Sequence, residues 1–126
     1  YTATVLAIEP RSGQLRWHHQ EVPHDVWDYD SAYEALLIPR AGRQMMVHLN
    51  KGGHVTVLDS ASGQVDHVWR FSDHVNWVSG VDPKSGALIG RNEPEVGKSK
   101  LFCPSALGAR SWNHGAYSPR TGLWYT

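Results

Sequence analysis

Two carboxylates spaced for joint chemistry stand out in the stretch Pro23-His24-Asp25-Val26-Trp27-Asp28-Tyr29-Asp30. Asp28 and Asp30 are two residues apart, so in an extended segment their side chains point to the same side. Two carboxylates on one side can bind a hard cation, and either one can act as a general base. The alternative is a solvated acidic loop, which is the common fate of an Asp-x-Asp pair. Residues elsewhere in the chain decide between them.

The histidines and the single cysteine give weaker evidence for a reactive or metal-binding site. His18, His19 and His24 have no second carboxylate or cysteine at zinc-site spacing. We therefore expect structural or surface roles for His18 and His19, and a loop-shaping role for His24. Cys103 is the only cysteine, so it is either buried or paired with a cysteine outside this chain.

The composition excludes two classes of partner. The 126 residues contain 12 Lys plus Arg and 12 Asp plus Glu, a formal net charge of zero, whereas a surface that binds nucleic acid needs a basic excess. No apolar run approaches the roughly 18 residues of a transmembrane segment. The apolar content of 40% suffices for an ordinary core. We expect neither a nucleic-acid partner nor a transmembrane segment in this chain.

The elements that must position the two carboxylates are strands. Short apolar or alternating runs, separated by turn residues, are typical of an all-β chain. A stretch of about residues 72–104, richer in Gly, Pro and charge, is expected to be an excursion rather than sheet. The predicted strands are Thr2–Ile8, Leu15–Gln20, Ala35–Ile38, Gln44–Asn50, His54–Asp59, Val65–Phe71, Ala116–Ser118 and Leu123–Thr126.

The turns between these strands repeat one another. An acidic residue lies four positions before a glycine in 9–13, 59–63 and 82–86, and a shorter form recurs at 118–122. Repeats of short strands with a period near 50 residues indicate β-propeller blades. In the first repeat a tryptophan, Trp17, follows the glycine by four residues and is expected to pack between blades.

Several blocks of the chain together resemble one family. The 23–30 stretch is followed by Leu49-Asn50-Lys51-Gly52-Gly53, by 76–86, and by 103–105 leading to Trp112-Asn113 and 117–123. In this order they resemble the pyrroloquinoline-quinone (PQQ)-dependent alcohol dehydrogenases. The resemblance implies an eight-bladed β-propeller with tryptophan-docking motifs, one of them around Trp17, and a quinone and a metal ion near the axis. It also implies an oxidoreductase that passes hydride from an alcohol to the quinone.

The resemblance assigns roles to five residues. Asp28 matches the catalytic base and also a metal ligand. Asp30 matches the additional carboxylate of members that use a lanthanide ion in place of Ca²⁺. Lys51 matches the cation beside the quinone carbonyls, and Ser111 and Trp112 fall in the block that touches the cofactor. Ser111 replaces the asparagine usual in the family, and this shorter side chain alters the hydrogen bonding available to the quinone.

The resemblance further implies that the chain is a fragment. We expect two to three blades of one propeller domain, with blade pieces at about 1–20, 33–71 and 105–126, and we expect the fragment alone to be inactive. A periplasmic location and a cytochrome c-type electron acceptor are implied as well. Two alternatives remain: a non-enzymatic β-propeller scaffold, which has no use for the Asp28, Asp30 and Lys51 set, and a sugar-oxidising PQQ dehydrogenase.

Overall fold

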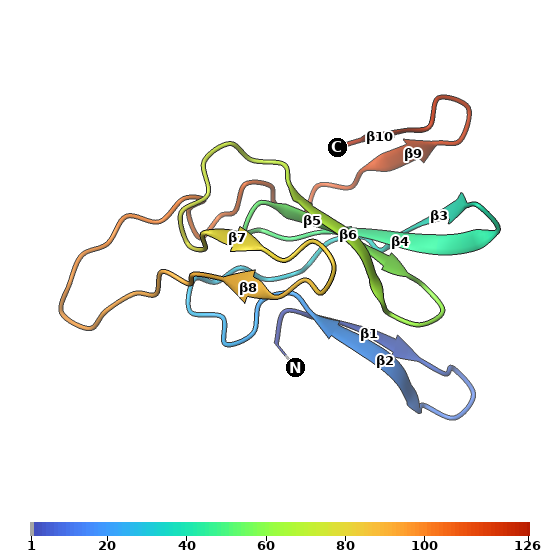
Figure 1. Cartoon of the computed structure of the whole chain (residues 1–126), viewed down its shortest axis with the longest axis horizontal. Coiled ribbons are helices and arrows are strands. Elements are labelled where there is room, and N and C mark those ends of the chain that lie inside the picture. Colours follow the sequence, from blue (N-terminus) through green and yellow to red (C-terminus); the bar gives the residue numbers. More distant parts are fainter. Residues whose placement is uncertain (1) are drawn as a thin grey trace.

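The computed structural model describes residues 2–126, which fold into ten strands in four antiparallel sheets (Figure 1). Within this part of the chain no segment forms a helix able to cross a membrane. The predicted blade piece 1–20 begins on Tyr1, which lies outside the described residues. The sheets are β1 (Thr4–Ile8) with β2 (Leu15–Gln20); β3 (Leu36–Arg40), β4 (Arg43–Leu49), β5 (His54–Asp59) and β6 (Val65–Arg70); β7 (Gly80–Val81) with β8 (Leu88–Ile89); and β9 (Ala116–Ser118) with β10 (Leu123–Tyr125).

The central sheet is the meander β3-β4-β5-β6. Most residues of its two inner strands are buried, and these include the polar side chains of His48, His54 and Thr56 as well as apolar ones. Met45, Val47 and Val57 form the core of one face, against which Trp124 of β10 packs. Pro39 lies in β3, an edge strand, where its missing N–H costs no ladder hydrogen bond.

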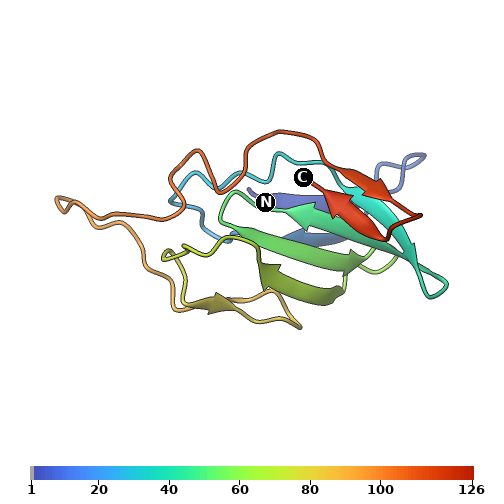
Figure 2. The same cartoon turned by 90° about the horizontal axis from the view of Figure 1, so that it is seen from above.

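Two hairpins flank this sheet, β1–β2 below it and β9–β10 above it in Figure 1. In Figure 1 the β1–β2 hairpin, the central sheet and the β9–β10 hairpin follow one another from bottom to top. Seen from above, the long loop after β8 extends away from the sheets (Figure 2). Each unit therefore presents a sheet face to the next, as blades of a propeller do.

The four repeated turns have the same backbone geometry. The N–H of Gly13, Gly63, Gly86 and Gly122 donates to the carbonyl four residues earlier at 2.8–2.9 Å, and each glycine has φ near +70°. In the second and third turns the Asp carboxylate also accepts from N–H groups of the turn. This side-chain bond explains the acidic residue in the repeat.

The Trp17 indole connects the first hairpin to the central sheet. Its Nε1 donates to the Ser60 carbonyl at 3.1 Å, and its ring covers Gly63, where an added Cβ would lie 2.6 Å from ring atoms. The predicted tryptophan packing between neighbouring units is thus confirmed for Trp17. Glycine is needed at position 63 for two reasons: the turn requires a positive φ there, and the Trp17 ring leaves no room for a Cβ.

Two local features differ from the sequence predictions. The stretch 72–104 is mostly irregular but contains the two-residue hairpin strands β7 and β8 around the turn 82–86, so it was wrong to exclude sheet there. The third strand runs to Arg40, and the tight turn that follows consists of Ala41 and Gly42, both with positive φ. That turn was missed because alanine is rare in the left-handed region.

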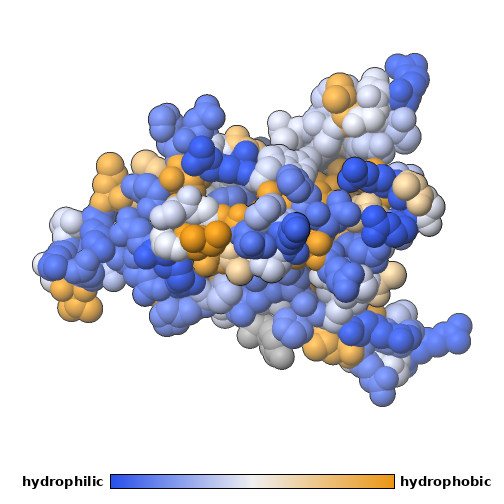
Figure 3. Space-filling model, viewed as in Figure 1, coloured by the Kyte–Doolittle hydropathy of each residue, from blue (hydrophilic) through white to orange (hydrophobic). Residues whose placement is uncertain are grey.

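The surface seen in Figure 3 is a patchwork in which hydrophilic residues cover much of the hairpin tips and apolar patches interrupt them. Apolar patches are also visible on the long loop at the left of the view. The exposed apolar residues of this loop include Val96 and Leu101.

Candidate active site

The loop that carries Asp28 and Asp30 alternates between buried and exposed side chains. Trp27 and Tyr29 are buried, whereas the side chains of Asp28 and Asp30 are 70% and 65% exposed. The aromatic residues therefore anchor the loop in the core and turn both carboxylates outward on one side. This is the same-side arrangement predicted from the spacing.

Asp25 shapes the start of this loop. Its carboxylate accepts hydrogen bonds from the backbone N–H of Trp27 at 2.9 Å and of Tyr29 at 2.8 Å. Between them Asp28 has φ +67°, a left-handed conformation that is strained for most residues and tolerated better by Asp. Strained backbone often occurs at functional sites, because the surrounding contacts must enforce it.

A buried aromatic cluster packs against the loop that carries Asp28 and Asp30. The Trp77 ring lies edge-on to the rings of Trp27 and Tyr29, with centroid distances of 4.9 and 5.1 Å. The Tyr29 hydroxyl donates to the Pro104 carbonyl at 2.6 Å, and burial raises the pKa of Tyr29 to about 12, so it remains a donor at neutral pH. The 72–104 stretch supplies Trp77 and Pro104, so it is part of the support of the site.

Lys51 is held in place by the turn between β4 and β5. The Asn50 side chain accepts the Gly52 N–H at 2.6 Å, and the Trp77 indole donates to the Gly52 carbonyl at 2.8 Å. The Lys51 carbonyl accepts from Ala109, and its aliphatic stem lies over Gly108. The Lys51 side chain is only 14% exposed. These contacts and this burial restrict the position of the Lys51 ammonium.

The five residues predicted from the sequence lie around one cavity. The Lys51 Nζ lies 3.4 Å from an oxygen of Asp28 and 3.3 Å from an oxygen of Asp30. A cavity of about 210 Å³ opens beside them, and the indole of Trp112, 76% exposed, forms part of its wall. The lining residues are Asp28, Asp30, Ala32, Tyr33, Lys51, Ala106, Leu107, Ser111 and Trp112. Their chemical roles remain predictions.

The donor set fits part of a metal site. Hard cations take six to eight oxygen ligands, and Asp28 and Asp30 offer exposed carboxylates that face the same cavity. Among residues 2–126 no group of three or more His, Cys, Asp or Glu side chains is placed to hold an ion. This chain can thus supply two carboxylates, and the other ligands must come from a bound cofactor, water or residues outside it.

The set also fits part of a site for a flat, electron-poor cofactor. The exposed Trp112 indole offers an aromatic surface, and the Lys51 ammonium can donate to carbonyl oxygens. Ser111 lines the cavity beside Trp112 and offers a hydroxyl. The arrangement can place a cation, a base and a planar group side by side.

Sequence reasoning missed Arg91. Its guanidinium donates to the His24 carbonyl at 2.7 Å, also donates to the Pro23 carbonyl, and lies 4.8 Å from the centroid of the Trp27 ring. Arg91 thus clamps the loop that carries the carboxylates, from nearly 70 residues away. No local pattern could signal this contact, because it depends on how the 72–104 stretch folds back.

The remaining sequence candidates have structural positions. His19 lies over Gly86, and burial lowers its pKa below the ordinary value despite the opposing charge of Glu21. Cys103 is a free, half-buried thiol, and its pairing with a cysteine outside this chain stays a prediction. His24 has φ +49° and lies at the bend of the loop, as a loop-shaping residue should.

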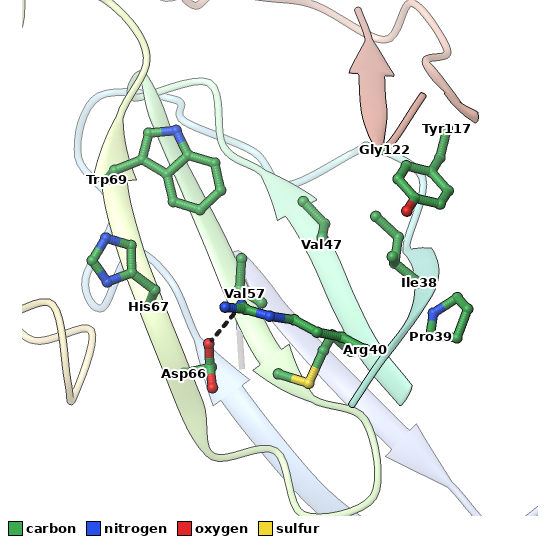
Figure 4. A pocket seen from close by; sticks show the side chains of 11 residues that line it. Ile38, Pro39, Arg40, Val47, Val57, Asp66, His67, Trp69, Tyr117 and Gly122 are labelled. Carbon is green, nitrogen blue, oxygen red and sulfur yellow. Dashed lines mark hydrogen bonds and ion pairs between the residues drawn. The ribbon is translucent and has the colours of Figure 1, made fainter. Parts of the chain in front are cut away.

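A larger cavity lies away from these residues, on the face of the central sheet next to β9–β10 (Figure 4). It has a volume of about 610 Å³ and contains none of the five predicted site residues. Figure 4 shows side chains such as Ile38, Val47 and Trp69 around it, with one ion pair between Arg40 and Asp66 at 3.4 Å. Its size reflects an open sheet face rather than a set of reactive groups.

Comparison with known proteins decides the family. Residues 1–74 match the family described as "PQQ: Glucose/ethanol/alcohol dehydrogenase, beta-propeller domain". The chain belongs to this family. The family assignment and the all-β propeller fold predicted from the sequence are therefore confirmed.

Relatives in this family cover almost the whole chain. It is 38% identical to the quinohemoprotein alcohol dehydrogenase of Comamonas testosteroni, over 99% of this chain and 18% of that protein. It is 32% identical to the lanthanide-dependent methanol dehydrogenase of Methylorubrum extorquens, over 99% of this chain and 23% of that protein. The solved structure of a europium-containing methanol dehydrogenase matches with a TM-score of 0.88 at 30% identity, over 100% of this chain and 23% of that chain. The chain spans about a fifth of the length of the proteins it matches.

Proposed function

We propose that this chain is a segment of a PQQ-dependent enzyme that oxidises alcohols. The observation that carries the proposal is the convergence of Asp28, Asp30 and Lys51 on one cavity walled by Trp112. A propeller that served only as a scaffold would have no need to aim a lysine at two exposed carboxylates. Relatives are named quinoprotein ethanol dehydrogenase, quinohemoprotein alcohol dehydrogenase and lanthanide-dependent methanol dehydrogenase, which supports this substrate class.

In this proposal Asp28 and Asp30 bind the metal ion, and Asp28, Lys51, Ser111 and Trp112 also have the following roles. Asp28 accepts the hydroxyl proton of the alcohol, since its exposed carboxylate faces the cavity. Lys51 donates hydrogen bonds to carbonyl oxygens of the cofactor and stabilises negative charge there. Trp112 packs against the planar cofactor, and Ser111 offers it a hydroxyl. Held beside these residues, a quinone would supply a hydride acceptor, and a metal ion bound by Asp28 and Asp30 would supply a Lewis acid.

We also propose a lanthanide as the preferred ion, with Ca²⁺ as the alternative. The support is the second carboxylate, Asp30, which faces the same cavity as Asp28. A trivalent cation gains more from an additional anionic ligand than a divalent one does. The relatives named as lanthanide-dependent or europium-containing support this choice. If the full-length enzyme is as active with Ca²⁺ as with La³⁺, the role given to Asp30 is wrong.

The partners follow the same proposal. We propose that electrons leave to a cytochrome c-type acceptor and that the enzyme works in the periplasm. A relative from Thauera butanivorans, 32% identical over 99% of this chain, is named 1-butanol dehydrogenase (cytochrome c). Reduction of a purified cytochrome c by the full-length enzyme with alcohol present tests the acceptor.

The central test is Asp28→Asn in the full-length enzyme. The amide keeps the size of the side chain but cannot accept the proton, so kcat/KM for alcohol oxidation should fall by about 10²- to 10⁴-fold. Asp66→Asn is the matched control, because Asp66 pairs with Arg40 on the open sheet face away from the site. Unchanged activity of Asp28→Asn would favour the scaffold alternative.

The family description also includes glucose dehydrogenases, so a sugar remains the second candidate substrate. Comparing kcat/KM for primary alcohols and for aldoses with the same full-length preparation separates the two. Faster oxidation of an aldose would overturn the alcohol proposal while leaving the quinone chemistry intact.

We further propose that the isolated 126-residue chain is inactive, because it supplies two carboxylates rather than a full ligand set. Purified chain that reduced a dye on addition of PQQ, metal ion and ethanol would contradict this.

A further inference from the structure

A buried acid–base pair contacts the loop of the candidate site and has no role in the function proposed above. Glu21, just after β2, and His48, on β4, are 7% and 3% exposed, and His48 Nδ1 lies 3.0 Å from the Glu21 carboxylate. Burying such a pair is costly, and apolar residues of similar size often stabilise a fold as well. The pair therefore needs an explanation beyond stability.

The free atoms of the pair connect to the loop that carries Asp30. The second Glu21 oxygen accepts a hydrogen bond from the Ser31 hydroxyl. His48 Nε2 lies 3.3 Å from the Tyr33 carbonyl. Both imidazole nitrogens thus face acceptors, a carboxylate and a carbonyl, and an imidazole satisfies both only when it is protonated on both nitrogens. The pair holds the backbone on the C-terminal side of Asp30.

Asn50 extends this network to the other side of the site. Its amide nitrogen donates to the Ser31 hydroxyl and to the Tyr29 carbonyl, both at 3.1 Å. Its amide oxygen accepts from Gly52, which places Asn50 in the turn that presents Lys51. One buried network therefore touches the loop of the two carboxylates and the turn of the lysine.

We propose that the Glu21–His48 pair is a positioning device that sets the Asp28–Asp30 loop against Lys51 through Ser31 and Asn50. The inference rests on the proposed function of that site. Glu21 and His48 touch neither the cavity nor the reacting groups, so they are positioning residues and act through the loop. Displacing the loop changes how the two carboxylates share a cation, and supporting residues of this kind alter metal affinity by about 10- to 100-fold.

The test measures metal binding directly, as well as activity, in the full-length enzyme. Tb³⁺ is titrated by its luminescence into protein prepared without metal, and kcat and KM are measured with La³⁺. Glu21→Gln keeps the shape of the side chain but removes its charge. We expect Tb³⁺ affinity to fall by at least about 10-fold, and kcat to fall more than KM rises. Unchanged Tb³⁺ affinity and an unchanged kcat would overturn the proposal.

Glu21→Gln leaves the His48 charge buried and unpaired, so it can also reduce folding. Ser31→Ala avoids this, because it removes the link to the loop and leaves the Glu21–His48 contact in place. It should reproduce the loss of Tb³⁺ affinity with a nearly unchanged melting temperature. Normal Tb³⁺ affinity in Ser31→Ala would assign the pair a purely structural role and overturn the inference.

Two further variants make the result interpretable. Glu9→Gln applies the same chemical change to an exposed ion pair with Arg16 in the β1–β2 hairpin, and it should change neither readout. Asp30→Ala tests the proposed function itself. If Asp30→Ala leaves Tb³⁺ affinity unchanged, the metal site is wrong. If Asp30→Ala weakens binding and Ser31→Ala does not, only the positioning inference fails.

Discussion

The contact of Trp17 with Gly63 allows a quantitative test of the packing between units. Gly63→Ala introduces a Cβ that would lie 2.6 Å from two atoms of the Trp17 ring, at a residue with φ +73°. Gly13→Ala is a matched control in the equivalent turn, with φ +71° and no atom within 4 Å of the added Cβ. The two variants share the backbone cost and differ in the ring contact alone.

The expected magnitudes follow from these contacts. An alanine in the left-handed region costs about 1–2 kcal/mol, and this cost applies to both variants. At Gly63 the displaced ring adds an overpacking cost of about 1–3 kcal/mol. Loss of the hydrogen bond from the Trp17 indole to the Ser60 carbonyl adds about 1 kcal/mol. Gly63→Ala should therefore destabilise by about 2–4 kcal/mol more than Gly13→Ala.

Equilibrium urea unfolding of the full-length protein measures this difference as a shift of the midpoint at constant m-value. A double-mutant cycle then assigns the cause. In a Trp17→Ala background the ring is absent, so Gly63→Ala and Gly13→Ala should become equivalent. Equal free energies of unfolding for the two glycine variants in the wild-type background, within about 0.5 kcal/mol, would refute the docking argument.

Three further outcomes are expected. Ala41→Gly should raise the free energy of unfolding by about 1 kcal/mol in urea unfolding, because Ala41 has φ +50° and glycine relieves that strain; a lower stability would contradict this. Lys51→Met keeps the aliphatic stem and removes the ammonium, so kcat with alcohol should fall by about 10²- to 10³-fold, and an unchanged kcat would exclude its proposed role. Burial lowers the pKa of His48. Glu21, through its hydrogen bond and its charge, raises this pKa, as do the Tyr33 carbonyl and the charge of Glu34, and the net result is a pKa above the ordinary value. The stabilisation by protonated His48 is therefore complete below about pH 6.5 and is lost as pH rises through the raised pKa. The melting temperature should fall as pH rises above about 6.5, and His48→Gln should reduce this dependence of melting temperature on pH.

Elements with local signals were predictable. The strands Leu15–Gln20, His54–Asp59 and Ala116–Ser118 have the predicted bounds, because apolar alternation and glycine turns act over a few residues. Pro39 concealed the end of the third strand, and the Ala41 turn lacked the usual glycine or asparagine at its first position. The β7–β8 hairpin was missed because each of its strands has only two residues.

Some features of the candidate site had a signal in the sequence, and others did not. The spacing predicted that Asp28 and Asp30 face the same side, and both line one cavity, although Asp28 has φ +67° rather than an extended backbone. The family resemblance pointed to Lys51, Ser111 and Trp112, which line the same cavity. The Arg91 clamp had no local signal, because its partners lie nearly 70 residues away. The Glu21–His48 pair was not recognised because glutamate usually lies at the protein surface and histidine is often partly exposed.

By itself, the sequence determined the strand periodicity, the repeated turns and the residue types available for chemistry, since these depend on neighbours along the chain. Only the tertiary structure decided which groups meet. It turned Trp27 and Tyr29 inward onto Trp77, left the two carboxylates exposed, and brought the buried Glu21–His48 pair into contact with the same loop through Ser31. The physical reason is that the energies of burial and of charge pairing depend on distances in space, which the order of residues does not specify.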